Sequence, residues 1–288
     1  MAYPLMEHLI GKGFLYCGKY YRVRSELTES LQKPVDIRIY YETVGVKDGV
    51  LLFVEDHLQR LVNSVKGLEN FPVNTSSILA EAYSFIDMDG IKDGSIRIVL
   101  TKEVLLIHQA DISIPTEEQF ENGINTSILN WERKTPNLKI FRGDYKTTVN
   151  EKFKEENAHG LPFELVLTDN EGKLYEGSMS NLFVIRDGKV YSAPDNKILI
   201  GITRKRVMEA LKRSGLELQI GTFKPEELDP AKDAVFVSST PFDILPVRYM
   251  DGYEFRSSDN EVLKMISKMY KEYTSEYINA AKRALNGQ

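Results

Sequence analysis

The sequence contains one cysteine, Cys17, among its 288 residues, so it cannot form an internal disulfide bond. Proteins of oxidising compartments commonly depend on such bonds, and a chain without them fits the cytosol. Free cysteine is among the most buried residue types, so we expect Cys17 to be a small packed residue rather than a nucleophile. The scarcity of cysteine therefore favours a cytoplasmic protein that is stabilised by its hydrophobic core.

Long apolar runs and an excess of positive charge are absent as well. No stretch approaches the ~20 apolar residues that span a bilayer, and the N-terminus lacks the pattern of a signal peptide. Lys and Arg number 37 against 42 Asp and Glu, giving a net charge of −5, so nothing indicates nucleic-acid binding. With 42% hydrophobic residues and no repeat, the chain can form one large or two medium domains.

Residues 165–204 are the most informative part of what is present. Glu176 lies in a small polar segment between two apolar runs that are expected to be strands. A buried carboxylate is costly unless a positive group meets it. Gly201 and Thr203 lie where the chain enters a helical pattern at Arg204, and a helix start of this kind binds anions. Together they suggest one ligand with a positive end and a phosphate end.

Two segments of this stretch, EGSMSNLFVI (176–185) and LIGITRKRV (199–207), resemble the signature region of class IV aminotransferases, the fold-type IV pyridoxal-phosphate enzymes. That family includes branched-chain aminotransferases, D-amino acid aminotransferases and aminodeoxychorismate lyase. The resemblance implies an α/β fold of the α+β type, with a smaller N-terminal domain and a larger C-terminal domain that binds pyridoxal 5′-phosphate. Residues 115–122 carry proline and charge between apolar strands, so we expect domains at 1–114 and 123–288 joined by this linker.

A third segment, YETVGVKDGVLLFVEDHLQRL (41–61), resembles the family's N-terminal motif of strand, hairpin and helix. The resemblance implies that Arg60 binds the cofactor phosphate and that Tyr41 faces the substrate. Taken alone, Arg60 would be a solvated helix arginine, because it falls off the apolar stripe of the predicted helix. His57 is expected to pack near the helix start rather than to act as a catalytic base.

Two lysines compete for the role of the residue that carries the cofactor. In the family this lysine lies at a strand end before a helix, somewhat over thirty residues upstream of the motif glutamate. Lys139 follows an extended segment and precedes a helix that we expect at 144–158, whereas Lys146 lies within that helix. We favour Lys139 as the catalytic lysine and keep Lys146 as the alternative. Both also fit the solvated surface lysines that most lysines are.

The same resemblance assigns the remaining cofactor contacts. Glu176 would lie against the pyridine nitrogen and hold it protonated, and Ser180 in the same motif would contact the cofactor. Ile202 and Thr203 would bind the phosphate through backbone N–H groups and the threonine hydroxyl, at the favourable dipole end of the helix.

The segment FVSSTPFDILPV (236–247) resembles the last motif of the family. Ser239 and Thr240 would contact the phosphate or the substrate carboxylate. The sequence departs from the family pattern at Pro241, where many members have a residue whose backbone N–H helps to bind the carboxylate. Proline has no N–H, so this contact to the substrate's carboxylate is not expected here, and the departure bears on which amino acid is accepted.

Hydrophobic periodicity predicts the other elements. Strands are expected at 35–46, 50–54, 95–101, 104–108, 124–130, 182–185 and 234–240. Helices are expected after an N-cap at Asp56, at 76–87, at 144–158, from Arg204, and along a C-terminal apolar stripe between Val262 and Tyr277.

An arginine and a histidine two residues apart contribute to the substrate site of D-amino acid aminotransferases. That pair cannot be placed here, because Val99 stands two residues after Arg97 and Ala110 two residues after His108. This argues against specificity for D-amino acids.

We therefore predict a pyridoxal-phosphate aminotransferase that acts on an amino acid and a 2-oxo acid, with branched-chain amino acids as the favoured substrates. One alternative is a lyase of the aminodeoxychorismate type, which would use the same cofactor and lysine to eliminate pyruvate. Another is a class IV fold that has lost turnover and serves as a binding protein. The resemblance also implies a homodimer, and no metal, membrane or nucleic-acid partner is expected.

Overall fold

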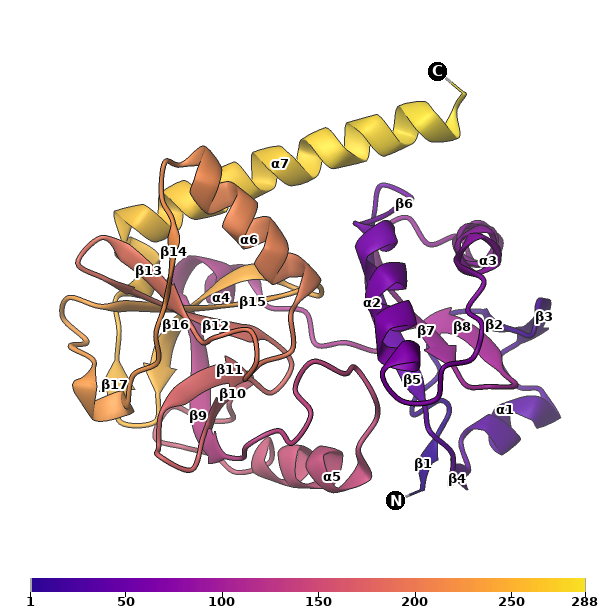
Figure 1. Cartoon of the computed structure of the whole chain (residues 1–288), viewed down its shortest axis with the longest axis horizontal. Coiled ribbons are helices and arrows are strands. Elements are labelled where there is room, and N and C mark those ends of the chain that lie inside the picture. Colours follow the sequence, from indigo (N-terminus) through magenta and orange to yellow (C-terminus); the bar gives the residue numbers. More distant parts are fainter. Residues whose placement is uncertain (1, 288) are drawn as a thin grey trace. The chain divides into compact units, whose positions relative to one another are not determined.

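The computed structural model describes residues 2–287 and divides into two compact units (Figure 1). The first unit combines the described residues up to Ser113 with Leu138–Lys146 and the described residues from Ser275 onward. The second unit comprises Ile114–Asn137 and Thr147–Thr274. Two segments of the first unit, 138–146 and 275–287, thus lie in the range that the sequence analysis gave to the C-terminal domain. The domain limits drawn from the sequence stay a prediction.

The first unit is built on an antiparallel six-stranded sheet with the strand order β3-β2-β8-β7-β5-β6. Its strands are β2 (Gly13–Tyr16), β3 (Lys19–Arg22), β5 (Tyr40–Lys47), β6 (Val50–Leu51), β7 (Gly94–Leu100) and β8 (Leu105–Gln109). A separate pair joins β1 (Tyr3–Pro4) to β4 (Pro34–Val35). The helices are α1 (Glu26–Leu31), α2 (Val54–Lys66) and α3 (Thr75–Asp89).

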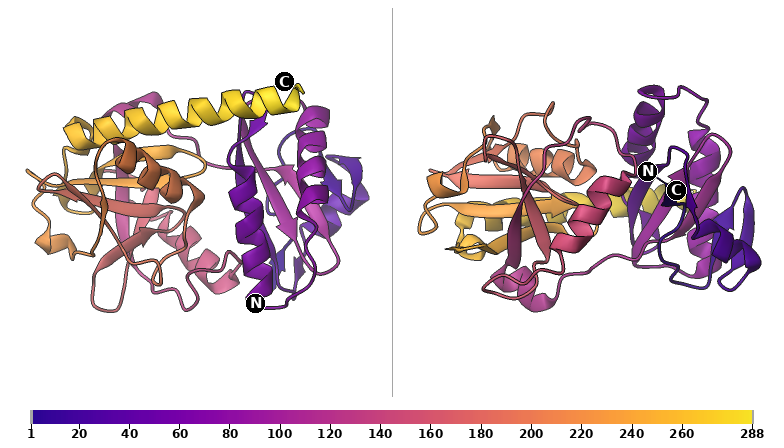
Figure 2. Two further views of the ribbon diagram at one scale, coloured as in Figure 1. Left: turned by 45° about the horizontal axis from the view of Figure 1, so that its top comes forward. Right: turned by 90° about the horizontal axis from the view of Figure 1, so that it is seen from below.

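The two faces of this sheet carry different cores, because successive side chains of a strand point to opposite sides. One face packs against α2 and α3 (Figure 2) and contains Val44 and Val46 of β5. Val99 of β7 and Leu106 of β8 belong to the core on the other face. Tyr41 packs against that second core, whereas Glu42, its neighbour in β5, bonds to α2. The alternation along β5 thus assigns these two residues to different surroundings.

The second unit contains a nine-stranded sheet that closes on itself. The order is β11-β10-β9-β16-β15-β12-β13-β14, with β17 paired to β16, and a further pairing between β11 and β12 completes a ring. Its strands are β9 (Ile124–Asn130), β10 (Glu164–Thr168), β11 (Leu174–Gly177), β12 (Asn181–Arg186), β13 (Lys189–Ser192), β14 (Leu218–Ile220), β15 (Ala234–Ser239), β16 (Asp243–Met250) and β17 (Tyr253–Glu254). The pairing that closes the ring joins Glu176 to Asn181.

Helices cover part of this sheet from outside (Figure 1). Val207 and Leu211 of α6 (Ile202–Arg213) pack with Phe183 of β12 and Phe236 of β15, and Ile266 of α7 joins the same core. The other helical elements are α4 (Glu117–Asn122), α5 (Gly143–Lys152), η1 (Pro225–Glu227), η2 (Ser257–Asp259) and α7 (Glu261–Leu285). The membership of the two units changes within α5 and within α7.

Several expected elements differ from those observed. The strand predicted at 35–46 begins only at Tyr40. Helix α2 begins at Val54, after Phe53 with a φ of 50°, so Asp56 is not its N-cap. Cys17 is exposed at the turn between β2 and β3, where we had predicted a packed residue. Its φ of 46° explains the position, since the chain must reverse there.

Within the described part of the chain, no helix combines the length and apolarity needed to cross a bilayer. The same residues include no cluster of three or more His, Cys, Asp or Glu side chains placed to hold a metal ion.

Candidate functional site

In the first unit, the predicted phosphate ligand Arg60 is anchored by Glu42. The guanidinium donates from Nε to Glu42 Oε1 at 2.8 Å and from Nη2 to Glu42 Oε2 at 2.6 Å. His57 Nδ1 donates to the same carboxylate at 2.7 Å. The Arg60 side chain is only 11% exposed, so it is not the solvated helix arginine that it would be by itself. Glu42 fixes the direction in which Arg60 presents its charge.

Burial and neighbouring charges both shift the pKa values of Glu42 and His57 beside Arg60. Burial alone would raise the pKa of Glu42, but Arg60 and the His57 hydrogen bond outweigh it and lower that pKa to about 2. Burial lowers the pKa of His57, and Arg60 and Lys139 add to this effect. His57 is therefore a neutral donor to an ionised carboxylate. This agrees with the packing role expected for it.

Tyr41 lies among aromatic and cationic groups. Its ring stacks on Phe141 with the centroids 4.0 Å apart. The Arg97 guanidinium lies 5.5 Å from the centroid of Tyr41, and Lys139 Nζ lies 4.9 Å from it. Cations within about 6 Å of an aromatic face are attracted by its quadrupole. The structure thus brings two predicted site residues, Tyr41 and Lys139, into direct contact.

The two candidate lysines have different surroundings within the first unit. The backbone of Lys139 is held by two hydrogen bonds, since its N–H donates to Ser64 Oγ at 3.3 Å and its carbonyl accepts from the Tyr41 N–H at 3.5 Å. Lys146 lies in α5 and its Nζ is 3.7 Å from Glu7 Oε1. Lys139 Nζ lies over the Tyr41 ring. Its charge, together with that of Arg60, contributes to lowering the pKa of His57. The choice of Lys139 over Lys146 stays a prediction.

In the second unit, Glu176 is 1% exposed and forms an ion pair with Arg133, with Nε 2.8 Å from Oε1. The other carboxylate oxygen accepts from the N–H of Leu199 at 3.1 Å. The positive group that a buried glutamate requires is therefore Arg133, which the sequence analysis did not consider. Nothing in its loop, such as a periodic pattern or a motif, marks it as the partner of Glu176.

A second buried carboxylate, Glu164, holds the turn that follows Glu176. It is fully buried and accepts from both Ser178 Oγ at 2.6 Å and Ser180 Oγ at 2.7 Å. Burial raises the pKa of Glu164, and these two hydroxyls together with backbone amides oppose the shift. Ser180, predicted to touch the cofactor, therefore donates to Glu164. A glutamate at the head of the apolar run 164–167 was the signal that could have identified this residue.

The start of α6 contains the predicted phosphate ligands. Ile202 and Thr203 are both buried, and the N-cap residue Gly201 offers no side-chain acceptor to the amides of the first turn. Asn181 Nδ2 donates to the carbonyl of Leu199 at 2.8 Å. A Cβ on Gly201 would fall well inside 3.0 Å of Asn181 Oδ1, so a side chain there would force Asn181 to move. Asn181 thus connects the start of α6 to the strand that pairs with Glu176.

Ser239 and Thr240 lie where β15 turns into β16. Ser239 Oγ donates to the carbonyl of Met179 at 2.8 Å, which ties this turn to the segment after Glu176. Thr240 and Pro241 are half-buried in the same turn. In the second unit the structure therefore links Glu176, Ser239 and the start of α6 through the residues between 178 and 181.

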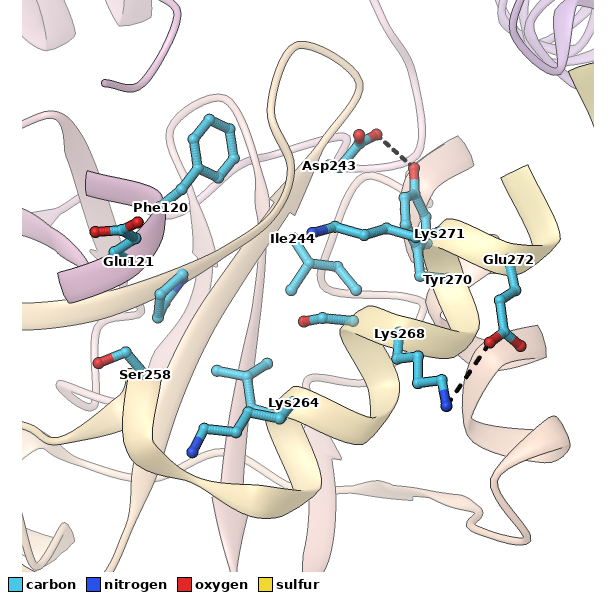
Figure 3. Close-up of a pocket in the computed structure, with 13 residues that line it drawn as sticks. Phe120, Glu121, Asp243, Ile244, Ser258, Lys264, Lys268, Tyr270, Lys271 and Glu272 are labelled. Carbon is cyan, nitrogen blue, oxygen red and sulfur yellow. Dashed lines mark hydrogen bonds and ion pairs between the residues drawn. The ribbon is translucent and has the colours of Figure 1, made fainter. Parts of the chain in front are cut away.

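The second unit also contains a cavity of about 750 Å³, which is lined by other residues than the predicted site (Figure 3). It is lined by Phe120 and Glu121 of α4 and by Lys264, Lys268 and Lys271 of α7. The Tyr270 hydroxyl donates to Asp243 at its edge, at 2.6 Å. The cavity contains none of the residues predicted to bind cofactor or substrate.

Comparison with known proteins identifies the family. The family model described as amino-transferase class IV matches residues 40–250. The chain belongs to the class IV aminotransferases. Every site residue predicted from the sequence, from Tyr41 to Thr240, lies within the matched range.

Curated relatives of this class IV aminotransferase have different activities. D-alanine aminotransferase of Bacillus licheniformis is 24% identical over 231 residues, covering 74% of this chain and 78% of that protein. Aminodeoxychorismate lyase of Bacillus subtilis is 24% identical over 254 residues, covering 83% and 86%. Branched-chain-amino-acid aminotransferase of Escherichia coli (strain K12) is 28% identical over 230 residues, covering 72% and 73%. At these identities the relatives do not fix the substrate.

Solved structures show the same fold. The branched-chain amino acid aminotransferase of Escherichia coli aligns with a TM-score of 0.74 at 23% identity, covering 90% of this chain and 93% of that one. A second branched-chain amino acid aminotransferase, from T.th. and solved with pyridoxamine 5′-phosphate, aligns with a TM-score of 0.75 at 21% identity, covering 93% and 95%. The predicted α+β fold of the fold-type IV enzymes is confirmed.

Proposed function

We propose that this protein is a pyridoxal 5′-phosphate-dependent aminotransferase that moves an amino group between a branched-chain amino acid and a 2-oxo acid. The observation that supports it most is the family match over residues 40–250, which includes all the predicted site residues. The named substrates of the Escherichia coli relative and of both aligned structures supply the branched-chain part of the proposal.

The residues of the second unit fit such a cofactor. An uncapped helix start with buried Ile202 and Thr203 suits a phosphate, because first-turn amides lack acceptors within the helix and the helix dipole favours an anion. Buried Glu176 suits a protonated ring nitrogen, since a carboxylate of this kind is stabilised by positive charge. Arg133 now supplies part of that charge.

When bound, the cofactor supplies an electron-withdrawing ring that stabilises negative charge at the substrate Cα. We assign Glu176 to hold the proton on the ring nitrogen, and Thr203 and Arg60 to bind phosphate. Lys139 would carry the cofactor and then move a proton at the substrate Cα.

A second candidate is a lyase of the aminodeoxychorismate type. The specific observation in its favour is the aminodeoxychorismate lyase of Bacillus subtilis, which matches 83% of this chain at 24% identity.

We further propose a cytoplasmic homodimer whose domain limits are those drawn from the sequence, 1–114 and 123–288. The resemblance to the family and the scarcity of cysteine support this part of the proposal. Sedimentation of the purified full-length protein would test the dimer.

The experiment that tests the function compares the wild type with Lys139→Ala and Lys146→Ala. Wild type incubated with pyridoxal phosphate and dialysed should retain it and transfer the amino group of L-leucine or L-valine to 2-oxoglutarate. Lys139→Ala should lose transfer, and Lys146→Ala should keep it, because Lys146 contacts Glu7 instead.

A wild type that retains no cofactor contradicts the proposal. Pyruvate release from aminodeoxychorismate, without transfer to 2-oxoglutarate, favours the lyase. Loss of transfer in Lys146→Ala but not in Lys139→Ala reverses the choice of lysine.

A further inference from the structure

The carboxylate of Glu164 accepts hydrogen bonds at both of its oxygens. Its Oε1 accepts from the N–H of Leu165 at 2.8 Å, the N–H of Ser178 at 3.1 Å and Ser178 Oγ at 2.6 Å. Its Oε2 accepts from Ser180 Oγ at 2.7 Å and the N–H of Met179 at 3.3 Å. Four of these five donors belong to the turn at 178–180. One buried carboxylate therefore holds three consecutive residues.

The turn is closed tightly around this carboxylate. The N–H of Gly177 donates to the carbonyl of Ser180 at 2.8 Å, and the N–H of Ser178 donates to the carbonyl of Leu165 at 2.8 Å. A Cβ on Gly177 would meet Glu164 Oε2 at 3.0 Å and would lie closer still to Ser180 Oγ. The turn has no room to shift toward Glu164, so the carboxylate defines its position.

Asn181, the first residue after the turn, connects it to the proposed cofactor ligands. It pairs in register with Glu176 and donates to the carbonyl of Leu199 at 2.8 Å. The N–H of Leu199 donates to Glu176 Oε2 at 3.1 Å. Gly201, the N-cap of α6, packs so closely on Asn181 that a side chain at 201 would displace the Asn181 amide. The position of Asn181 thus fixes both Glu176 and the start of α6.

We propose that Glu164 is a positioning residue for the cofactor, which it does not touch. By holding the 178–180 turn it sets Asn181, and through Asn181 it aligns Glu176 with the helix start at Gly201. The inference deepens the proposed function and rests on it. It adds a role for a residue that lies outside the motifs quoted from the sequence.

The chemistry requires a carboxylate rather than an amide of the same shape. A glutamine at 164 can still accept at Oε1 from Leu165 and Ser178. Its NH₂ group, however, would face the N–H of Met179, and two donors cannot bond to each other. The hydroxyl of Ser180 can rotate to accept, so the conflict is concentrated at Met179. Glu164→Gln therefore disturbs the turn without removing volume.

The test uses the full-length protein and equilibrium dialysis against pyridoxal phosphate. We expect Glu164→Gln to weaken cofactor binding about tenfold, the scale of one lost hydrogen bond to a charged group. Ser178→Ala removes one donor hydroxyl from the same carboxylate and should weaken binding in the same direction. This second variant serves if Glu164→Gln fails to fold.

Asp233→Asn is the matched control. Asp233 is also buried, and it pairs with Arg186 at 2.6 Å. Arg186 ends β12, whereas Asn181 begins it, so this carboxylate lies at the opposite end of the strand from the proposed site. We expect Asp233→Asn to lower the melting temperature of the cofactor-free protein and to leave the dissociation constant for pyridoxal phosphate unchanged.

The outcomes separate the two proposals. If the wild type binds pyridoxal phosphate and both Glu164→Gln and Ser178→Ala bind it equally tightly, the positioning role is overturned and the proposed function is not. Equal weakening by Asp233→Asn overturns it as well, because general destabilisation would then explain the loss. A wild type that binds no pyridoxal phosphate overturns the proposed function and this inference with it.

Discussion

Among individual residues, the buried acids show most clearly how charge is accommodated in this protein. Glu42, Glu164 and Glu176 are each at most 1% exposed, and each has a different solution. Glu42 is met by a bidentate arginine, Glu176 by an arginine and an amide, and Glu164 by hydroxyls and amides with no cation among its hydrogen-bond donors. Because hydrogen bonds to an ion are stronger than those between neutral groups, all three arrangements offset the cost of burial.

The pKa of Glu42 leads to a prediction about pH. Its folded value of about 2 lies below the ordinary 4.5, so the unfolded chain binds more protons between these values. The stability that Glu42 contributes is complete above pH 4.5 and is lost as the pH falls toward 2. We expect Glu42→Ala to cost about 3 kcal/mol at neutral pH, because Arg60 loses its buried partner.

Urea unfolding of wild type and Glu42→Ala at several pH values checks this expectation. The gap between the two proteins should narrow as the pH falls below 4.5. A gap that stays constant down to pH 3 would show that Glu42 is not the group that titrates.

Among the elements, α6 depends on a glycine for reasons of space. Gly201 has a φ of −70°, which alanine also adopts, so Gly201→Ala tests the steric conflict with Asn181 alone. We expect a loss of about 1–3 kcal/mol, the usual cost of overpacking. Gly252→Ala is the control, because nothing lies within 4 Å of its Cβ position and its φ is not positive.

Thermal unfolding of the two glycine variants provides the measurement. Gly252→Ala should stay within about 0.5 kcal/mol of wild type, as is usual for a surface substitution. An equal effect of both substitutions would mean that the contact between Gly201 and Asn181 is unimportant.

The elements also show what periodicity can predict. The strand expected at 124–130 is β9 with the same limits. Asp187 and Gly188 form the turn between β12 and β13, and their φ values of 50° and 72° are the positive ones that an Asp-Gly hairpin turn requires. The helix expected at 144–158 ends at Lys152, because the residues beyond it form turns.

The candidate site was less accessible to sequence reasoning. Glu176 and the start of α6 both belong to local motifs that can be found in the sequence alone. Arg133 pairs with Glu176 across more than forty residues, and Glu42 pairs with Arg60 across a hairpin. Periodicity reports which face of an element is apolar, and it does not report which charges meet. These partners therefore required the structure.

On the scale of the whole molecule, the end of α7 contributes to the first unit. The Tyr277 hydroxyl donates to Glu55 Oε2 at 2.8 Å, and its ring packs on Phe53 with the centroids 4.4 Å apart. Lys282 forms an exposed ion pair with Asp48. We expect Tyr277→Ala to cost about 2 kcal/mol, since it removes an aromatic contact and a hydrogen bond.

Amide hydrogen exchange would show which part of the first unit is destabilised by Tyr277→Ala. Tyr277→Ala should increase exchange at the start of α2, near Glu55, and Lys282→Ala should change little, because exposed ion pairs contribute at most about 1 kcal/mol. Unchanged protection of α2 in Tyr277→Ala would remove α7 from the support of the first unit.

The first unit is assembled from three segments that are separated in the sequence, and this limits the order in which the two units can fold during translation. Residues 138–146 leave the ribosome after β8, and the end of α7 leaves only after the whole second unit has been made. Domains generally fold as units in the order of their synthesis. Here the second unit can be completed before the first. The N-terminal residues of the first unit therefore stay only partly assembled until the end of α7 has been synthesised.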